Sequence, residues 1–297
     1  MPMPDLLLGA SSNDAGIAVF AAVTTDLVRD VQRRHDLWPT ATAAVGRLTT
    51  GAVLFGASLK GPERISLRID GDGPLKSATA DAWLLDEATL GARGYAVDPH
   101  VDLPIDARGK FDVAGAIGKG SLRVTKSYES GQPYVGVVAL QSGEIAEDLA
   151  VYLGRSEQIP SVVALGVLAN PTGIVAAGGV LAQVLPGADE RAIVALEARA
   201  LAMRPVTQLI AEHADAHALL HALAGDLELR AHRSVDIRFA CLCTQQRVEA
   251  ALAGLGGAEL RTMAREREES EATCEFCKKI YVFTSEDLLG LAERLES

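Results

Sequence analysis

Cys241-Leu-Cys243 and Cys274-Glu-Phe-Cys277 are two close cysteine pairs in the last fifth of a chain of 297 residues. Thirty residues separate the pairs, and the 240 residues before them contain no cysteine. Each pair can supply two sulfurs from one tight turn, and the intervening chain is long enough to bring the turns together. This spacing predicts a tetrahedral zinc site whose ligands are Cys241, Cys243, Cys274 and Cys277. The alternatives are two local disulfides or four buried apolar thiols.

Such a zinc site is either a permanent structural clasp or an oxidisable element. Zinc binds thiolates, so a four-thiolate site is electron-rich and can be oxidised unless burial and backbone N–H groups shield it. Structural zinc contributes about 10–16 kcal/mol to the folding of small modules, whereas whole domains have net stabilities of about 5–15 kcal/mol. The tail that carries the four cysteines is small, so we expect loss of the metal to unfold most of it.

Composition excludes several classes of partner. The net charge of −11 argues against nucleic acid and against an anionic membrane surface, because both attract basic proteins. We expect neither a secretory signal peptide nor a membrane span, since the apolar run from Thr49 to Leu59 is too short to cross a bilayer. The expected compartment is cytoplasmic, where close cysteine pairs more often indicate metal or redox chemistry than structural disulfides.

Residues 1–187 contain runs of strands with few helices. Ile17 to Val23 is a short apolar run that predicts a buried strand, and Ser161 to Ala169 and Ala176 to Val184 predict two more. The stretch from Ala41 to Leu59 is rich in small residues and predicts a helix packed closely in the core. This pattern predicts an α+β fold, with a mixed α/β N-terminal core domain over residues 1–187.

Pro186-Gly187 ends that domain, and residues 188–232 are predicted to form a helical linker. Asp189 can cap the first linker helix, and a second helix is expected to run from Val206 beyond Leu220. Their apolar side chains form a stripe, which consists of Ile193, Leu196, Val206, Leu209, Ile210 and Leu220. A linker without a core of its own must rest this stripe on another surface, so the six residues are candidates for a binding surface that opens.

Three histidines recur at four-residue spacing on or beside the stripe, at His213, His217 and His221. Two such side chains on one helix can bind a metal, but no carboxylate completes an HExxH pattern. We expect packed histidines, with a metal-binding or pH-sensing role as the alternative.

Residues 233–297 are predicted to form a small C-terminal zinc-binding module. A strand at Val235 to Phe239 leads into Cys241, and Ile280 to Phe283 is a strand after the second cysteine pair. The charged run from Ala264 to Glu271 predicts a solvated helix face. Thr284 to Asp287 fits a capping box for a last helix.

No catalytic motif is found in the first domain, so we expect no enzyme activity. The glycines of Gly71-Asp-Gly73 and Gly178-Gly179 fit neither GxxxxGK[ST] nor GxGxxG, and no serine lies in a GxSxG motif. Three rival functions remain: an enzyme with a constitutive zinc clasp, a zinc-ribbon adaptor, and a thiol oxidoreductase. The acidic charge disfavours a nucleic-acid adaptor, and Cys274 lacks the βαβ context of a thioredoxin-like motif.

With these cysteine pairs, the chain resembles the 33 kDa chaperonin family, the redox-regulated heat-shock holdases of bacteria. The order and spacing of the cysteines are similar to those of the family's zinc ligands. Further similar segments are spread over the first domain: Gly71-Asp-Gly-Pro-Leu75, Arg93-Gly94, Ser156-Glu-Gln-Ile-Pro160 and Ala176-Ala-Gly-Gly-Val-Leu-Ala-Gln-Val-Leu-Pro186.

The resemblance implies a specific activity. It implies an α/β core without enzymatic activity, a helical linker resting on that core, and zinc held by the four cysteines in the reduced, inactive state. Oxidation, often together with unfolding stress, would form the disulfides Cys241–Cys243 and Cys274–Cys277 and expel zinc. The module and the linker would then lose stability, and the protein would dimerise. Exposed apolar surface would bind unfolding client polypeptides without ATP and prevent their aggregation.

Overall fold

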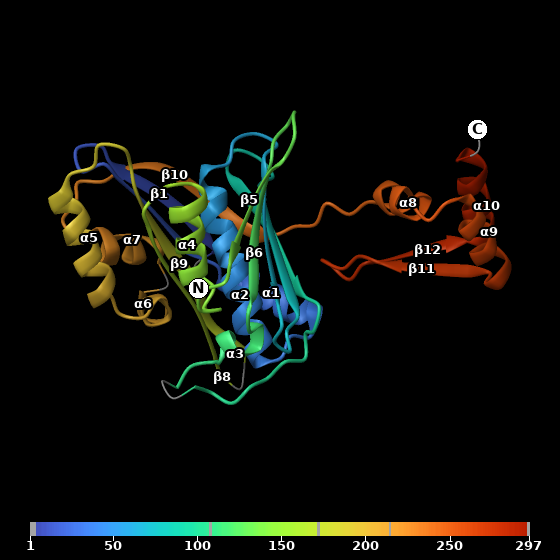
Figure 1. Ribbon diagram of the computed structural model, residues 1–297, viewed down its shortest axis with the longest axis horizontal. Coiled ribbons are helices and arrows are strands. Elements are labelled where there is room, and N and C mark those ends of the chain that lie inside the picture. The colour runs from blue at the N-terminus through green and yellow to red at the C-terminus, as the bar shows by residue number, and fades with distance from the viewer. Residues whose placement is uncertain (1–3, 107–108, 171–172, 214, 296–297) are drawn as a thin grey trace. The chain divides into compact units, whose positions relative to one another are not determined.

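The computed structural model describes residues 4–106, 109–170, 173–213 and 215–295 of the chain (Figure 1). The chain divides into two compact units, Met1–Ala240 and Cys241–Ser297. Each unit has a hydrophobic core of its own. The first unit combines one large sheet with helices, and the second combines a hairpin with helices, which confirms the α+β class.

A ten-stranded sheet is the frame of the first unit, with the order β7-β6-β3-β4-β5-β10-β1-β2-β9-β8. Neighbouring strands are antiparallel, except that β5 and β10 are parallel. The strands are β1 (Leu6–Ser12), β2 (Ile17–Val23), β3 (Arg64–Gly71), β4 (Ser77–Leu84), β5 (Thr89–Ala96), β6 (Gly120–Ser127), β7 (Tyr134–Ala139), β8 (Ser161–Asn170), β9 (Gly173–Val184) and β10 (Arg230–Phe239). The predicted strands at 17–23, 161–169 and 176–184 are therefore confirmed as β2, β8 and β9.

Both faces of the sheet are covered around β2, which explains its continuous apolar sequence. All residues of β2 are buried. The first unit has two main hydrophobic cores, one on each face of the sheet. Phe20 and Ala22 belong to the larger core, and Val19 and Ala21 belong to the smaller core. Successive side chains of a strand point to opposite faces, so β2 contributes to two separate cores at once.

Helix α2 (Pro39–Phe55) is the central helix of the larger core and is buried on all sides after its first residue. Pro39 occupies the first turn, where its missing N–H costs nothing. Small residues allow close packing: a Cβ at Gly46 would lie 2.8 Å from a Val28 methyl group, and one at Gly51 would lie 2.6 Å from Leu149. The predicted core helix is thus confirmed, although it ends at Phe55 and continues as the short 3-10 helix Gly56–Ser58.

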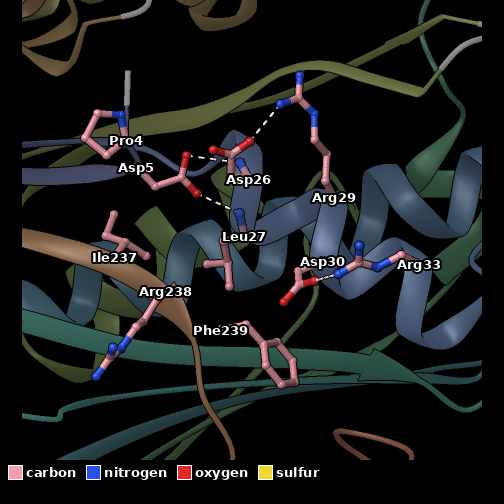
Figure 2. Close-up of a pocket in the computed structure, with 10 residues that line it drawn as sticks. All are labelled: Pro4, Asp5, Asp26, Leu27, Arg29, Asp30, Arg33, Ile237, Arg238 and Phe239. Carbon is pink, nitrogen blue, oxygen red and sulfur yellow. Dashed lines mark hydrogen bonds and ion pairs between the residues drawn. The ribbon is translucent and has the colours of Figure 1, made fainter. Parts of the chain in front are cut away.

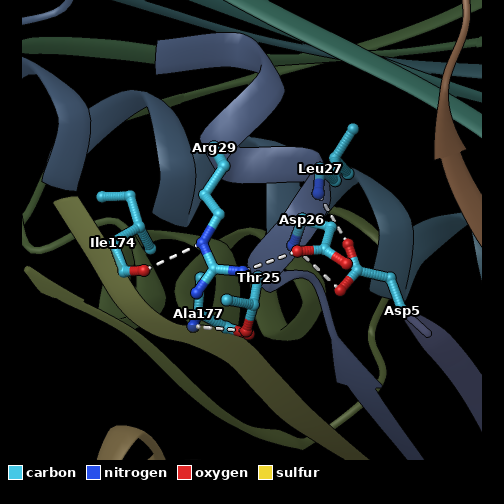
Figure 3. A network of polar contacts seen from close by, with 7 residues as sticks. All are labelled: Asp5, Thr25, Asp26, Leu27, Arg29, Ile174 and Ala177. Atoms are coloured by element: carbon cyan, nitrogen blue, oxygen red, sulfur yellow. Dashed lines mark hydrogen bonds and ion pairs between the residues drawn. The ribbon is translucent and has the colours of Figure 1, made fainter. Parts of the chain in front are cut away.

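Helix α1 (Thr25–His35) is capped from outside its own segment. Thr24 makes no side-chain capping bond, and the carboxylate of Asp5 accepts hydrogen bonds from the backbone N–H groups of Asp26 (3.0 Å) and Leu27 (2.6 Å) instead (Figure 3). Figure 2 shows the pocket of about 520 Å³ beside this helix end. Burial raises the pKa of Asp5 to about 7, outweighing the two N–H groups.

Helix α1 is bonded to β9 and also contains ion pairs between its own side chains. Arg29 donates to the backbone carbonyl of Ile174 at 2.9 Å and pairs with Asp26 at 2.7 Å (Figure 3). Arg33 pairs with Asp30 on the same pocket wall (Figure 2). The bond to Ile174 holds α1 against the sheet, and the two ion pairs within α1 neutralise charged groups of the pocket.

The predicted linker contains three helices, α5 (Glu190–Ala202), α6 (Val206–His213) and α7 (Ala216–Ala224), which we call the linker helices. On the face of the sheet opposite α2, α7 packs against β1, β2 and β9, α6 packs against β8 and β9, and α5 packs against α7 (Figure 1). Of the predicted stripe, Ile193 is half-buried, and the others are buried in this smaller core: Leu196, Val206, Leu209, Ile210 and Leu220. The stripe is covered, as a linker without its own core requires.

The single helix expected from Val206 beyond Leu220 is wrong, because the structure has two. The Asp215 carboxylate accepts a hydrogen bond from the backbone N–H of His217 at 2.9 Å and thereby starts α7 as its N-cap. Residue 214, between the two helices, lies outside the described residues. The stripe is therefore assembled from separate helices that meet on the sheet.

The three histidines are exposed, so the prediction that they are packed is wrong. The buried side of α7 includes Leu219, Leu220 and Leu223, and His217 and His221 lie on the opposite, exposed side. His213 ends α6 rather than sharing a helix with the other two. Their four-residue spacing consequently does not place all three on one helical face.

Strand β10 belongs to the first unit, whereas the sequence placed it in a C-terminal module beginning at residue 233. It pairs with β1 on one side and β5 on the other, and its Val235 and Ile237 are buried in the larger core. The compact second unit begins only at Cys241. The boundary therefore lies at residue 241 and not at 233, because β10 pairs with strands that are far away in the chain. Local sequence does not show which strands will pair.

The second unit consists of α8 (Gln245–Ala253), α9 (Gly257–Glu266), β11 (Glu269–Thr273), β12 (Ile280–Thr284) and α10 (Ser285–Arg294). Its core includes Leu260, Phe283, Leu288 and Leu291. The solvated helix predicted over 264–271 is wrong beyond Glu266, because 269–273 pair with β12 as a strand. The capping box of Thr284 and Asp287 is confirmed at the start of α10.

Among the described residues, no helix has both the length and the hydropathy that a membrane span requires.

Candidate metal centre

The second cysteine pair lies at the tip of the β11–β12 hairpin. Thr273 and Ile280 form the last pair of the ladder, and Cys274 follows directly. The Cys274 N–H donates to the Lys279 carbonyl at 3.0 Å, and the Lys278 N–H donates to the Cys274 carbonyl at 2.9 Å. Lys278 has a left-handed backbone, with φ of +59°. This turn brings Cys277 back beside Cys274, so that one short loop presents both sulfurs.

The first pair lies in the segment that leads into α8. The Thr244 side chain caps α8 by accepting from the Arg247 N–H at 3.2 Å, and the Arg247 guanidinium donates to the Leu242 carbonyl at 2.9 Å. These bonds hold the carbonyl between Cys241 and Cys243, and with it the turn that carries both thiols. The cap therefore acts on the geometry of the site as well as on the helix.

All four sulfurs converge on one point, within 4.8 Å of one another. Cys241 Sγ lies 3.7 Å from Cys274 Sγ, and Cys243 Sγ lies 3.3 Å from Cys277 Sγ. Zn–S bonds of about 2.3 Å in a tetrahedron place sulfurs about 3.8 Å apart, so the cluster fits a zinc ion. Among the described residues, this is the only group of three or more potential ligands close enough to hold one metal ion.

One hydroxyl group touches the cluster. Tyr281 Oη donates to Cys243 Sγ at 3.2 Å. Burial disfavours the Cys243 thiolate, but this bond and the other three thiols outweigh burial and lower its pKa to about 7. Burial raises the pKa of Cys277 to about 12. Cys243 and Cys277 therefore share one site but differ in how easily each loses its proton.

The hairpin loop that carries Cys274 and Cys277 also carries two lysines. Lys279 Nζ lies 4.8 Å from the centroid of the Tyr281 ring, and Lys278 Nζ pairs with Glu275 at 3.0 Å. The Lys278 charge is therefore paired with a carboxylate of the same loop, and the Lys279 ammonium group lies over the ring whose hydroxyl bonds to Cys243. The half-buried cysteines are thus accessible enough to react and placed well enough to bind metal.

The structure brings the four predicted ligands together in the second unit, and five of the six stripe residues, all but Ile193, are buried in the smaller core of the first unit. The two predicted disulfides stay predictions, since all four cysteines are free thiols. Sequence reasoning missed Tyr281 and Lys278. A tyrosine two positions into a strand gives no sign of its hydrogen bond, but a residue directly after a CxxC pair is a recognisable position for a left-handed turn.

Comparison with known proteins gives one consistent family. The family model described as "Hsp33 protein" matches residues 5–284. The 33 kDa chaperonin of Bacillus licheniformis is 39% identical over 293 residues, covering 98% of this chain and all of the relative. The 33 kDa chaperonin of Bacillus cereus strain AH187 is 38% identical over 295 residues, with 99% and 100% covered.

A solved structure agrees with the sequence matches. The crystal structure of the 33 kDa chaperonin, or heat shock protein 33 homolog, from Thermotoga maritima superimposes with a TM-score of 0.89 and 32% identity. The match covers 99% of this chain and all of the other. From the family model, the full-length relatives and this fold, the chain belongs to the Hsp33 family.

Proposed function

We propose that the protein is a redox-regulated, ATP-independent holdase chaperone whose reduced, zinc-bound form is inactive. The observation that carries this proposal is the convergence of four free thiols in a small unit whose own core contains two of them. Cys243 and Cys274 pack against the cluster of Leu260, Phe283 and Leu288. A metal at these sulfurs would hold the turn before α8 and the β11–β12 hairpin together, so that its loss acts directly on this core.

Oxidation would remove all four ligands in two equivalent steps. In each step a thiolate attacks a peroxide oxygen and becomes a sulfenic acid, and the neighbouring thiolate displaces water to form a disulfide. Two peroxide molecules thus take four electrons, four protons are consumed, and two disulfides, four waters and one free zinc ion result. The proposed pairs are Cys241–Cys243 and Cys274–Cys277. Bound zinc supplies a Lewis-acid centre that keeps the thiols deprotonated until then.

The linker helices are the proposed client surface. Their stripe comprises Ile193, Leu196, Val206, Leu209, Ile210 and Leu220, and all but Ile193 are buried against the sheet. Strand β10 joins the chain of α7 to Cys241 and pairs with β1, on which α7 also packs. Unfolding of the second unit would therefore reach the linker through β10. Burial of one aliphatic side chain stabilises a structure by about 1.5–3 kcal/mol. Because the uncovered stripe would expose several such side chains, it would bind apolar segments strongly.

The same exposed surface would account for two further features of the proposal. Exposed apolar patches associate with each other, so the oxidised protein is proposed to form a homodimer through the uncovered stripe. The clients are unfolding polypeptides of the cytoplasm, where reduced thiols persist until oxidative stress.

The experiment follows zinc, oxidation and activity in one sample. Zinc-loaded protein is treated with peroxide at raised temperature, zinc release is read with a chromogenic chelator, and light scattering of a thermally unfolding test protein is recorded. Zinc release and suppression of scattering should rise together and reverse with dithiothreitol and added zinc. If scattering is equally suppressed before and after zinc release, the switch is refuted.

The ligand assignment has its own test. The double variant Cys274→Ser/Cys277→Ser should lose tight zinc binding, since two hydroxyls replace two thiolates. Glu275→Ser is the matched control, because Glu275 lies in the same loop and its side chain is exposed. Wild-type zinc affinity in the double variant would contradict the assignment.

A further inference from the structure

Strand β8 ends the ten-stranded sheet and has an unpaired edge. It pairs with β9 alone among the described residues. The Val184 N–H donates to the Pro160 carbonyl at 2.9 Å, so the position opposite Val184 is a hydrogen-bonded pair. In an antiparallel ladder such pairs alternate with non-bonded ones. Even-numbered residues of β8 therefore bond to β9, and the backbone groups of Ser161, Val163 and Leu165 face the open edge.

These outward groups have no backbone partner among the described residues. Ser161, Val163 and Leu165 are half-buried rather than exposed. The edge is thus recessed, and it presents a donor and an acceptor at every second residue, about 6.6 Å apart. An extended main chain has that repeat, and neither a helix nor a small molecule does.

The recess is a groove of about 870 Å³, and β8 is its floor. Helix α4 (Ala146–Ser156) contacts β8 on one side and contributes Glu147 and Ala150. The junction of α5 and α6 forms the other wall, with Met203 and Pro205.

Thr207 fixes how closely the second wall approaches the strand. A Cβ at Gly166 would lie 2.6 Å from the Thr207 methyl group, so α6 rests directly on β8 there. The floor is apolar on both faces, because Val163 and Leu165 join the larger core while Val162 and Ala164 join the smaller one. Side chains of a strand added at this edge would meet the α4 wall and the α6 wall alternately.

Three of the charged residues that line the groove are held in ion pairs. Arg47 pairs with Glu144 at 2.8 Å, and Arg204 pairs with Glu212 at 2.7 Å. The two other charged residues that line the groove, Lys110 and Glu147, have opposite signs, so the walls match an uncharged segment better than an acidic or basic one.

We propose that this groove binds an extended, uncharged, apolar polypeptide segment, which adds to β8 as an eleventh strand. The identity of the natural occupant, a short segment of an unfolding client, rests on the proposed function, and the chemistry of the groove does not. One strand added at β8 leaves the linker stripe covered, so this binding is separate from the holdase activity that oxidation is proposed to release. A second copy of β8 does not fit, because strands pair at about 4.8 Å and the α4 and α6 walls of two copies would collide. The recognition is of main chain, so it suits clients of unrelated sequence.

The test uses the full-length, reduced, zinc-loaded protein and a fluorescein-labelled seven-residue peptide of alternating valine and threonine. Binding is read by fluorescence anisotropy. A second peptide, N-methylated at two adjacent central residues, loses a donor on both edges and should bind at least about tenfold more weakly. Equal affinity for the two peptides, or no saturable binding of the first, overturns the proposal.

Variants locate the binding on β8. Ala150→Trp fills the groove from α4 and should weaken binding about tenfold or more, whereas Arg155→Trp places the same side chain on an exposed part of α4 and should not. Val163→Pro removes one outward N–H and leaves the β9 ladder intact, and should weaken binding about fivefold. Wild-type binding by Ala150→Trp, with unchanged thermal unfolding, overturns the proposal even if Val163→Pro fails to fold.

The outcomes separate this inference from the holdase proposal. Peptide binding is measured without oxidant, and aggregation suppression is measured after peroxide. If the peptide binds as expected but oxidised protein fails to suppress aggregation, the groove stands and the redox function falls. If aggregation suppression depends on oxidation but Ala150→Trp binds the peptide like the wild type, the groove falls and the redox function stands.

Discussion

Ile210→Ala should release the linker helices without any oxidation. Ile210 lies in α6, is 3% exposed and packs in the smaller core. Its Cδ1 atom occupies the space beside Gly178, where a Cβ would lie only 2.5 Å away. The packing of Ile210 thus depends on the missing side chain of Gly178 in β9, and this glycine has no side chain to fill the space that Ile210 leaves.

The size of the effect follows from this cavity. Truncation of a buried isoleucine to alanine costs about 2–5 kcal/mol, and sites that cannot collapse lie in the upper part of that range. We expect a loss of about 3–4 kcal/mol in the free energy that holds α6 and α7 on the sheet. Since each 1.4 kcal/mol is tenfold, the population with the linker released should rise about 140-fold to 700-fold.

Hydrogen exchange read by mass spectrometry measures this population directly. Amides of α6 and α7 in the reduced, zinc-loaded variant should lose protection by that factor. Leu201→Ala is the matched control, because Leu201 is 90% exposed on the neighbouring helix α5 and its truncation should change protection less than about threefold.

The same sample tests whether the stripe binds clients. Reduced Ile210→Ala should bind more bis-ANS than the wild type and partly suppress aggregation of a thermally unfolding protein without peroxide. A loss of protection below tenfold would refute the packing argument. The expected loss of protection without any gain in bis-ANS binding or aggregation suppression would refute the stripe as the client surface.

Two further predictions follow from the pKa shifts. Tyr281→Phe removes the hydrogen bond from the tyrosine hydroxyl to Cys243. In the reduced, metal-free protein the pKa of this thiol should therefore rise from about 7 toward its ordinary value near 8.5, as measured by the pH dependence of its alkylation. An unchanged pH profile would contradict the role of the bond. Asp5→Asn tests the buried cap of α1. The folded-state pKa of Asp5 is raised to about 7, so its stabilising contribution is complete below its unfolded value near 3.8 and is lost as pH rises through 7. Urea unfolding of the first unit, which contains both tryptophans, should therefore show the variant gaining up to about 4 kcal/mol relative to the wild type between pH 4 and 7.5; a difference independent of pH would contradict it.

The chemistry of the metal centre was readable from the sequence because close cysteine pairs bring their own local geometry. CxC and CxxC place two sulfurs on one turn whatever surrounds them, and only one fold-back is needed to complete the site. Tyr281 was missed because its hydrogen bond crosses from β12 to the turn before α8, a contact that no spacing rule contains.

The elements of the first unit were predicted well where one property dominates. β2 is apolar throughout, and α2 is made of small and apolar residues, so the type of each element was clear. The linker was harder because α6 and α7 read as one amphipathic stretch until the Asp215 cap divides them. The histidine spacing misled for the same reason, since a repeat of four residues has meaning only within one continuous helix.

The sequence by itself determined the four thiols, their pairing along the chain and the apolar stripe, because each depends on residues close in sequence. Only the tertiary structure decided that β10 joins the sheet of the first unit, that the stripe is covered by β1, β2 and β9, and that β8 is left with an open edge. Strand order is set by pairings between residues far apart in the chain, and their free energy comes from burial and hydrogen bonds that exist only once the partners meet.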